Sequence, residues 1–399
     1  MQETPQVIPR IRSGQLAMVG YIVCGLGALA SLVIGYIKSQ RNGLDFQWHG
    51  SDFILRGVDP WRAYLAGSNQ ILTHSPPNYA HELYILLLPL GAMPYPIAAR
   101  AWYALNVILS LAAVWLVGEI YEMDRARRLL LLLLLWGSLP FRNGLYAGQQ
   151  AVLELFFFSL VFYLTGNLGR GIALGLSIAK YSFAPVLVPV LFFRRKFELL
   201  AWSLIPPVVG LLAVWGFVHG SFIHLAIEPL LVNRTGVCPG AGDIMTLIEN
   251  IFGYRSPIAT LIPVSLAILY AWHIARDEDR SPSEDMACIS VGSLLLVNHL
   301  LYDYIFLIAP LAYAFQKMRG PMRWATFGIV GFFWYVETLG RLTAVTRQTF
   351  SLQLISAALF LGLLSILELD IRAPVCGNSL LRSAGSIDVI EAHIQQPTA

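Results

Sequence analysis

The residues best suited to chemistry stand in a short polar stretch from Leu44 to Trp61, after the first long apolar run of the chain. If this stretch is one helix, its ionisable residues fall at i, i+4, i+7, i+11 and i+14 on one face, namely Asp45, His49, Asp52, Arg56 and Asp59. The large apolar residues fall off that face, namely Phe46, Phe53, Ile54 and Trp61. A charged side opposite an apolar side predicts a helix at a membrane surface, where a carboxylate can act as a general base.

Further polar residues interrupt the apolar runs later in the chain. They are Arg142, Gln149, Lys180, His299 and Asp303. Ionisable groups at membrane depth are costly and are usually functional. The topology argued below puts these residues at the outer ends of several spans, so we predict that they converge on one site.

Each of these residues also has an ordinary structural explanation. Asp52 can form a local ion pair with Arg56, and Gln149 can cap the start of a helix. Lys180 can be a lysine whose ammonium reaches the membrane interface. His299 and Asp303 can be hydrogen-bonded to each other between helices.

Composition identifies the class of protein. Of 399 residues, 56% are hydrophobic and only 13% are charged, whereas soluble domains carry about 25% charged residues. We therefore expect an all-α polytopic membrane protein. The basic clusters then set topology and do not form a nucleic-acid surface. The four cysteines show no metal-site spacing, and the first apolar run lacks a signal-peptide cleavage site.

About ten to twelve membrane spans are expected, because a spanning helix needs about 20 apolar residues. The best candidates are 15–37, 97–121, 129–142, 150–166, 198–219, 258–275, 286–301, 303–317, 324–341 and 350–371. The basic clusters can all be cytoplasmic if 38–96 forms one large outer loop with interfacial helices. Residues 1–371 are then one transmembrane domain, and 372–399 are a cytoplasmic tail.

The apolar run from Gly171 to Phe193 is broken by Lys180-Tyr181-Ser182-Phe183-Ala184-Pro185. Its two flanks, Arg170 and Arg194, both have cytoplasmic character. We therefore predict two short half-helices that meet at Lys180, an arrangement tolerated at membrane depth only where it lines a cavity or is buried in protein.

Several short motifs resemble, in their order and spacing, glycosyltransferase family 87 of the GT-C superfamily. In the first loop the match is Asp45-Phe46 and then Arg56-Gly57-Val58-Asp59-Pro60-Trp61. Further on, Ser75-Pro76-Pro77 precedes an apolar segment with Pro89-Leu90, and Gly148-Gln149 opens a helix. A Gly-rich helix that ends in Lys and then Pro is matched by Gly171, Gly175, Lys180 and Pro185.

The chain departs from the family's pattern at two places. His49 stands where the family often has Tyr. Gly242-Asp243-Ile244-Met245 replaces an Asn-x-Ser-like element of a later outer loop. Both departures leave the acceptor and the donor sugar open.

The resemblance implies a GT-C-type enzyme of the bacterial inner membrane with both termini cytoplasmic. It would move a hexose, mannose in several members, from a polyprenyl-phosphate sugar to a lipid or glycan acceptor, with inversion at the outer face. Asp45 would be the general base. Lys180, Arg142 and His299 would stabilise the phosphate, while Asp52, Gln149 and Asp303 would complete the substrate site. Neither a metal nor a cofactor is expected.

A transporter or flippase of lipid-linked sugars is the competing hypothesis, because it would also use intramembrane charges and broken helices. The chain shows no internal repeat of the kind that many transporters carry. A protein that kept the fold but lost activity is a third possibility. The sequence does not indicate an oligomeric state.

Overall fold

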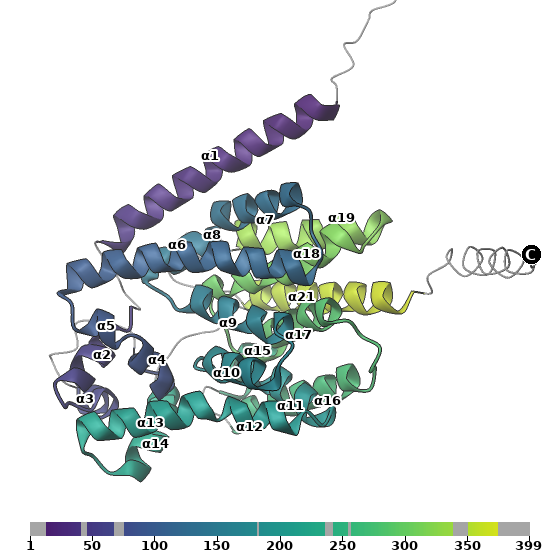
Figure 1. Ribbon diagram of the computed structural model, residues 1–399. Coiled ribbons are helices and arrows are strands. Elements are labelled where there is room, and N and C mark those ends of the chain that lie inside the picture. Colours follow the sequence, from purple (N-terminus) through teal and green to yellow (C-terminus); the bar gives the residue numbers. More distant parts are fainter. Residues whose placement is uncertain are drawn as a thin grey trace, which may run out of the picture.

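The computed structural model describes residues 13–40, 46–67, 76–181, 183–235, 242–253, 257–337 and 350–373, and over these residues it contains helices and turns but no strand (Figure 1). Within these described ranges, five helical segments are long and apolar enough to cross a membrane. The prediction of an all-α polytopic membrane protein is therefore confirmed.

The long segments form the frame of the bundle. They are α1 (Ser13–Ser39), α6 (Tyr95–Ile120), α12 (Phe197–Ser203) continued by α13 (Ile205–Val218), α16 (Pro257–Ala275) and α21 (Phe350–Arg372). A sixth span is possible if α7 (Arg125–Gly137) and α8 (Leu139–Ala147) are counted together, although they meet at a bend of 58°.

Shorter helices fill the space between these segments, so the described residues hold fewer full-length spans than the sequence predicted. They are α9 (Ala151–Tyr163), α10 (Asn167–Ser177), α11 (Ala184–Phe193), α15 (Ile244–Phe252), α17 (Pro282–Leu296), η1 (Leu301–Leu307), α18 (Ile308–Gln316), α19 (Gly320–Gly331) and the π-helix η2 (Phe332–Glu337). The expected span at 286–301 stops at Leu296. Every residue from Asp285 to Leu296 is buried, which is typical of a helix surrounded by other helices.

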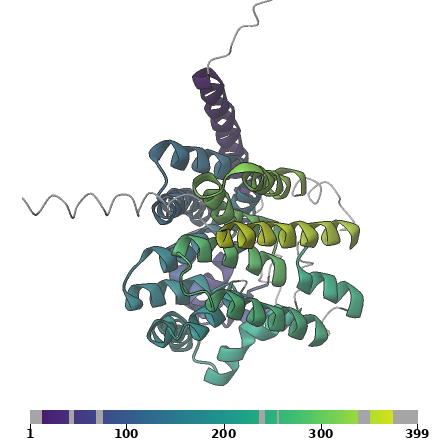
Figure 2. The same ribbon diagram turned by 90° about the vertical axis from the view of Figure 1, so that its right-hand side faces the viewer.

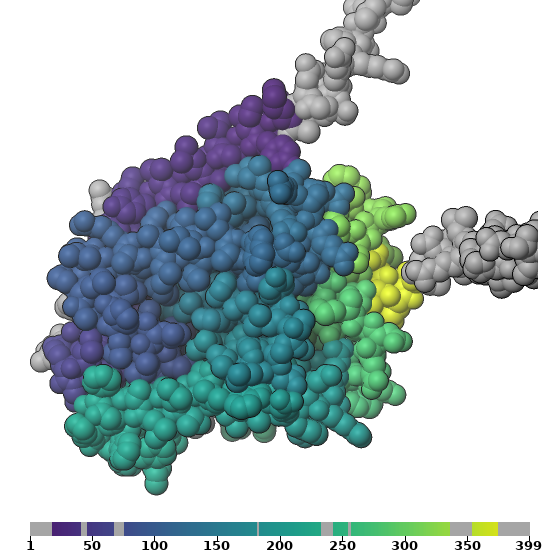
Figure 3. Space-filling view, viewed as in Figure 1, coloured from purple at the N-terminus to yellow at the C-terminus, as the bar shows by residue number. Residues whose placement is uncertain are grey.

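Helix α1 lies along the outside of the bundle and leans away from it (Figures 2 and 3). It packs mainly against α7 and α8. Its side chains Ile22, Val23 and Leu26 are more than half exposed. Lipid tails can cover such a surface, so the exposure is consistent with a helix at the edge of a membrane domain.

The predicted first loop contains short helices, as expected for 38–96. They are α2 (Trp48–Leu55), α3 (Pro60–Leu65), α4 (His81–Leu86) and α5 (Leu88–Gly91). They gather at one end of the bundle, beside the start of α6 and the end of α13 (Figure 1). They share a small hydrophobic core that includes Phe46, Trp61 and Tyr84.

The prediction of one continuous helix through the polar stretch is wrong. Helix α2 ends at Leu55, and Gly57 takes a positive φ of 73° that directs the chain away from the helix axis. Asp59 then caps α3, where its carboxylate accepts a hydrogen bond from the Arg62 N–H at 3.0 Å. His49 and Asp52 of α2 therefore do not share one helix face with Asp59, and Asp45 lies outside the described residues.

The apolar residues of the same stretch are buried inside the protein. Phe46, Phe53, Ile54 and Trp61 are at most 2% exposed. His49 is also buried and stacks against the ring of Tyr95. This histidine therefore belongs to the packed side of α2, and its burial lowers its pKa.

The two half-helices predicted around Lys180 are present. Helix α10 ends at Ser177 and α11 begins at Ala184, and Lys180 lies between them. Pro185 stands in the first turn of α11, where the missing proline N–H does no harm. Residues 179 and 180 thus lie in a backbone break inside the bundle.

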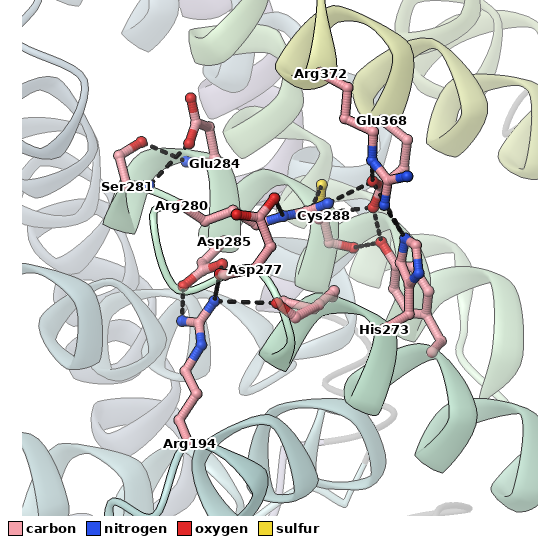
Figure 4. Close-up of polar contacts among 12 residues, drawn as sticks. Arg194, His273, Asp277, Arg280, Ser281, Glu284, Asp285, Cys288, Glu368 and Arg372 are labelled. Carbon is pink, nitrogen blue, oxygen red and sulfur yellow. Dashed lines mark hydrogen bonds and ion pairs between the residues drawn. The ribbon is translucent and has the colours of Figure 1, made fainter.

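A network of charged side chains joins four elements at the opposite end of the bundle (Figures 1 and 4). Arg194, just after α11, forms an ion pair with Asp285 of α17 and donates to the carbonyl of Asp277 at 3.1 Å. Arg280 forms an ion pair with Glu368 of α21. This end carries the loops that the sequence analysis predicted to be cytoplasmic.

Candidate active site

The break between α10 and α11 places Lys180 among acidic residues of other elements. Its ammonium forms an ion pair with Asp303 of η1, and the Glu154 Oε2 atom of α9 lies 3.9 Å away. The same ammonium lies 4.8 Å from the centroid of the Tyr302 ring. The Lys180 side chain is 14% exposed, so its charge is held inside the protein by residues of two other elements, η1 and α9.

Asp303 is held from two sides. One carboxylate oxygen accepts a hydrogen bond from the Lys180 ammonium, and the other accepts one from the Leu300 N–H at 3.0 Å. The side chain is fully buried. A buried charge is stable only when it is paired and hydrogen-bonded, and Asp303 meets both conditions. Its observed partner is Lys180 and not His299, the partner considered in the sequence analysis.

Gln149 follows a glycine that allows close packing of the first loop. Gly148 ends α8 with a positive φ of 74°, and a Cβ atom there would lie 2.7 Å from the Cβ atom of Phe46. The Gln149 Oε1 atom accepts a hydrogen bond from the Tyr79 hydroxyl at 3.2 Å. Its amide nitrogen is buried and has no hydrogen-bond partner among the described residues. Gln149 therefore connects the first loop to the start of α9 and keeps one donor unused.

His299 lies in the turn between α17 and η1, next to an acidic cap. Its Nδ1 atom lies 3.2 Å from the carbonyl oxygen of Val297 and 3.8 Å from Oδ2 of Asp243. Because the carbonyl can only accept, Nδ1 carries a proton. The buried Nε2 atom has no hydrogen-bond partner among the described residues, so it can serve a substrate.

The other predicted site residues stand apart from this group or outside the described ranges. Asp45 lies outside the described residues. Asp52 forms an exposed ion pair with Arg56, which is the ordinary alternative for it. Arg142 lies on the side of α8 that faces α1, where its Cγ atom would be 3.9 Å from a Cβ atom at Gly35.

Four polar residues around this region were missed by the sequence reasoning. They are Tyr79, Glu82, Glu154 and Asp243. Asp243 precedes an apolar helix and accepts a hydrogen bond from the Thr246 N–H at 2.7 Å, so its sequence signal is that of a helix cap. Its contact with His299 depends on tertiary packing. Only Glu154 had a usable signal, since it is an acidic residue inside an apolar run.

Comparison with known proteins provides the family. The family model for glycosyltransferase family 87 matches residues 82–298, which is more than half of the chain. The chain belongs to glycosyltransferase family 87. A search of curated proteins found no significant match.

Membership in family 87 makes this chain a membrane glycosyltransferase. The matched residues run from α4 to the end of α17 and include Gln149, Glu154 and Lys180. Asp45 and Asp52 precede the match, and His299 and Asp303 follow it directly. The family 87 match thus covers the Gly-Gln pair and the broken helix, while the first-loop aspartates are assigned by motif resemblance alone.

Proposed function

We propose that this family 87 protein transfers a hexose, most simply mannose, from a polyprenyl-phosphate sugar to a lipid or glycan acceptor. Transfer would take place at the outer face of a bacterial inner membrane. The observation that best supports this proposal is the position of Lys180 in a helix break, in contact with η1 and α9. The first loop reaches the same region through the Tyr79–Gln149 hydrogen bond.

The reaction that we propose is a single displacement with inversion. An acceptor hydroxyl oxygen forms a bond to the anomeric carbon from the face opposite the phosphate. The bond between that carbon and the phosphate oxygen breaks, and its electron pair leaves with the polyprenyl phosphate. The hydroxyl proton passes to the Asp45 carboxylate, which acts as the general base.

The leaving phosphate needs a positive environment more than it needs an acid, because a phosphate is already a good leaving group. Lys180 is the first candidate for stabilising the phosphate. A bound phosphate would compete with Glu154, the more distant of its two carboxylate partners, for the Lys180 ammonium. His299 can donate from Nε2 when both ring nitrogens carry a proton, and its Nδ1 atom lies 3.8 Å from Oδ2 of Asp243. Arg142 stands apart from this group, on the side of α8 that faces α1, so its part in binding the phosphate stays a prediction. None of these steps requires a metal.

Incubation of the purified protein with a panel of polyprenyl-phosphate sugars, followed by mass spectrometry of the lipid products, tests this proposal. We expect a glycosylated lipid with the wild type. With Asp45→Asn we expect a loss of at least about a hundredfold in rate, because general-base catalysis contributes about that much. Asp279→Asn, an exposed change at the opposite end, is the control and should leave the rate unchanged.

Two outcomes would contradict the proposal. Full activity of Asp45→Asn with normal membrane insertion would remove Asp45 from the mechanism. Movement of the lipid-linked sugar across a bilayer, without formation of a new glycosidic bond, would favour a flippase.

A further inference from the structure

Glu82 is a buried carboxylate that the proposed mechanism does not use. It stands in the first turn of α4 and is 4% exposed. Neither of its carboxylate oxygens has a hydrogen-bond partner on another described residue, although the backbone N–H of Glu82 itself lies close to the carboxylate. A buried carboxylate without a hydrogen-bond donor is costly, and such a group in a native fold usually has a functional explanation.

The residues just before Glu82 connect it to the candidate site. Tyr79 donates to Gln149, and the Ala80 N–H donates to the carbonyl oxygen of Ala179 at 3.0 Å. Ala179 is the neighbour of Lys180 in the helix break. On the other side of Lys180, Tyr181 lies close enough to Glu82 for the two side chains to interact electrostatically. The carboxylate therefore borders the helix break from the side of the first loop.

The backbone around Glu82 is held rigidly. Helix α13 approaches so closely that a Cβ atom at Gly210 would lie 2.5 Å from the backbone nitrogen of Glu82. The neighbouring His81 is also fixed, because its Nε2 atom lies 2.9 Å from the carbonyl oxygen of Leu225. A recognition residue needs this kind of support, since a loosely held group loses precision.

The chemistry of the missing partner follows from the carboxylate itself. An ionised carboxylate only accepts hydrogen bonds, and its two oxygens can accept from two neighbouring hydroxyls. It would repel a phosphate. A sugar ring offers adjacent hydroxyl donors, and hydrogen bonds from them to a carboxylate are charge-assisted and short.

We propose that Glu82 binds hydroxyl groups of a sugar ring in the candidate site, on the donor hexose or on the acceptor, and thereby selects the sugar. This inference rests on the proposed function. Selection by hydrogen bonding can be strong, because a sugar that lacks the hydroxyl leaves the carboxylate buried and unpaired.

The ionisation of Glu82 adds an independent readout. Burial raises the pKa of the Glu82 carboxyl to about 7. The accepting, ionised form therefore predominates only above that pH. The value of kcat/KM for the sugar that Glu82 binds should fall as the pH drops below about 7, and this fall should be absent in Glu82→Gln.

The test uses the full-length protein in nanodiscs of phosphatidylethanolamine and phosphatidylglycerol. Polyprenyl-phosphate mannose is the donor and octyl α-mannoside is the acceptor. Glu82→Gln should raise the KM of one of the two by about tenfold or more, the value of a hydrogen bond to a charged group. Its melting temperature should stay the same or rise. A higher KM for the donor would mean that Glu82 binds the hexose of the donor. A higher KM for the acceptor would mean that Glu82 binds the ring of the acceptor.

The matched control is Glu228→Gln in α14 (Phe222–Thr235). Burial and the nearby Asp59 also raise the pKa of Glu228 to about 7, but this carboxylate faces Asp59 and Arg62 of α3 and not the helix break. The Glu228→Gln variant should therefore have the KM values of the wild type for both the donor and the acceptor. If Glu82 binds the acceptor, octyl mannosides that each lack one hydroxyl identify the contacted group. For the analogue that lacks this hydroxyl, the wild type and Glu82→Gln should have the same KM.

Each remaining outcome is decisive. If Glu82→Gln has wild-type KM values and pH profile, the inference is overturned while the proposed function stands. A lower kcat together with a lower melting temperature would show a purely structural role and also overturn it. If the wild type transfers no sugar from any polyprenyl-phosphate donor, the proposed function fails, and the inference falls with it.

Discussion

At the scale of single residues, the charge of Lys180 is shared between two buried carboxylates, Asp303 and Glu154. Removing one partner of a buried ion pair leaves the other charge uncompensated, which costs about 3–5 kcal/mol. The two possible removals are not equivalent here. Without Lys180 two carboxylates stay buried, whereas without the Asp303 charge Lys180 still faces Glu154.

We therefore predict that Lys180→Gln lowers the melting temperature more than Asp303→Asn does. The double variant Lys180→Gln/Asp303→Asn should be more stable than Lys180→Gln alone, because the buried Asp303 charge that lost its lysine is gone. Thermal unfolding of the three variants in detergent measures this. Equal melting temperatures for the wild type and Lys180→Gln would mean that this ion pair does not contribute to the fold.

Glu82 gives a pH-dependent stability whose sign can be worked out. Its pKa is raised by burial from 4.5 to about 7, so between these pH values the unfolded chain releases the proton first. The stability due to this group is therefore full below pH 4.5 and is lost as the pH rises through about 7. The loss is roughly 3 kcal/mol when integrated over the shift.

Glu82→Gln should remove this loss. We predict that the variant and the wild type melt at similar temperatures near pH 4.5, and that the variant melts at a higher temperature at pH 8. The comparison needs only thermal unfolding at the two pH values. A variant that is less stable than the wild type at pH 8 would show that the Glu82 charge stabilises the fold, contrary to the argument from burial.

Residue types in apolar runs identified several members of the candidate site, but not their partners. Gln149, Lys180, His299 and Asp303 stand out in sequence because polar groups at membrane depth are rare. The pairing of Lys180 with Asp303 joins residues 123 positions apart and depends on the packing of η1 against the helix break. No local pattern encodes such a contact.

At the scale of elements, Gly148 allows the first loop to meet the start of α9. Its φ of 74° is unfavourable for other residues, and Phe46 leaves no room for a Cβ atom. Phe46 also stacks on Trp102, whose indole N–H donates to the Gly148 carbonyl at 2.9 Å. Phe46 directly follows the proposed base Asp45 in sequence, so a change at 148 acts on the loop that carries the base.

We predict that Gly148→Ala costs about 1–3 kcal/mol, the usual cost of a non-glycine residue in this backbone region. It should also lower the rate of sugar transfer. Gly216→Ala, inside α13, is the matched control because no atom lies within 4 Å of its added Cβ. The measurements are melting temperature and transfer rate. If both variants behave like the wild type, the first loop does not depend on this contact.

The elements themselves were predicted unevenly, for physical reasons. The break at Lys180 was predicted because a Lys and a Pro interrupt an apolar run. The continuous polar helix was wrong because Gly57 and Pro60 outweigh the charge periodicity. Asp59 before Pro60 is a signature of a helix start, and the structure has α3 beginning there.

At the scale of the whole molecule, the two ends of the bundle differ in character. One end carries the short helices of the first loop, and the other carries the ion pairs of Arg194 and Arg280 (Figures 1 and 4). Short loops rich in Lys and Arg stay in the cytoplasm, so this difference predicts the orientation. The proposed chemistry depends on it, because the helix break and the first loop must then face outward.

We predict that Val58 is accessible from outside the cell and Asp279 from the cytoplasm. Both side chains are exposed, at opposite ends of the bundle. Val58→Cys and Asp279→Cys would be made separately in a chain whose Cys238 and Cys376 are serines, leaving Cys24 and Cys288 in the apolar helices.

A membrane-impermeant maleimide should label the Val58→Cys variant in intact spheroplasts. It should label the Asp279→Cys variant only after permeabilisation, because the reagent cannot cross the bilayer. The reverse pattern would place the first loop in the cytoplasm and exclude transfer at the outer face, and labelling of both variants in intact spheroplasts would mean that the bundle does not separate the two ends.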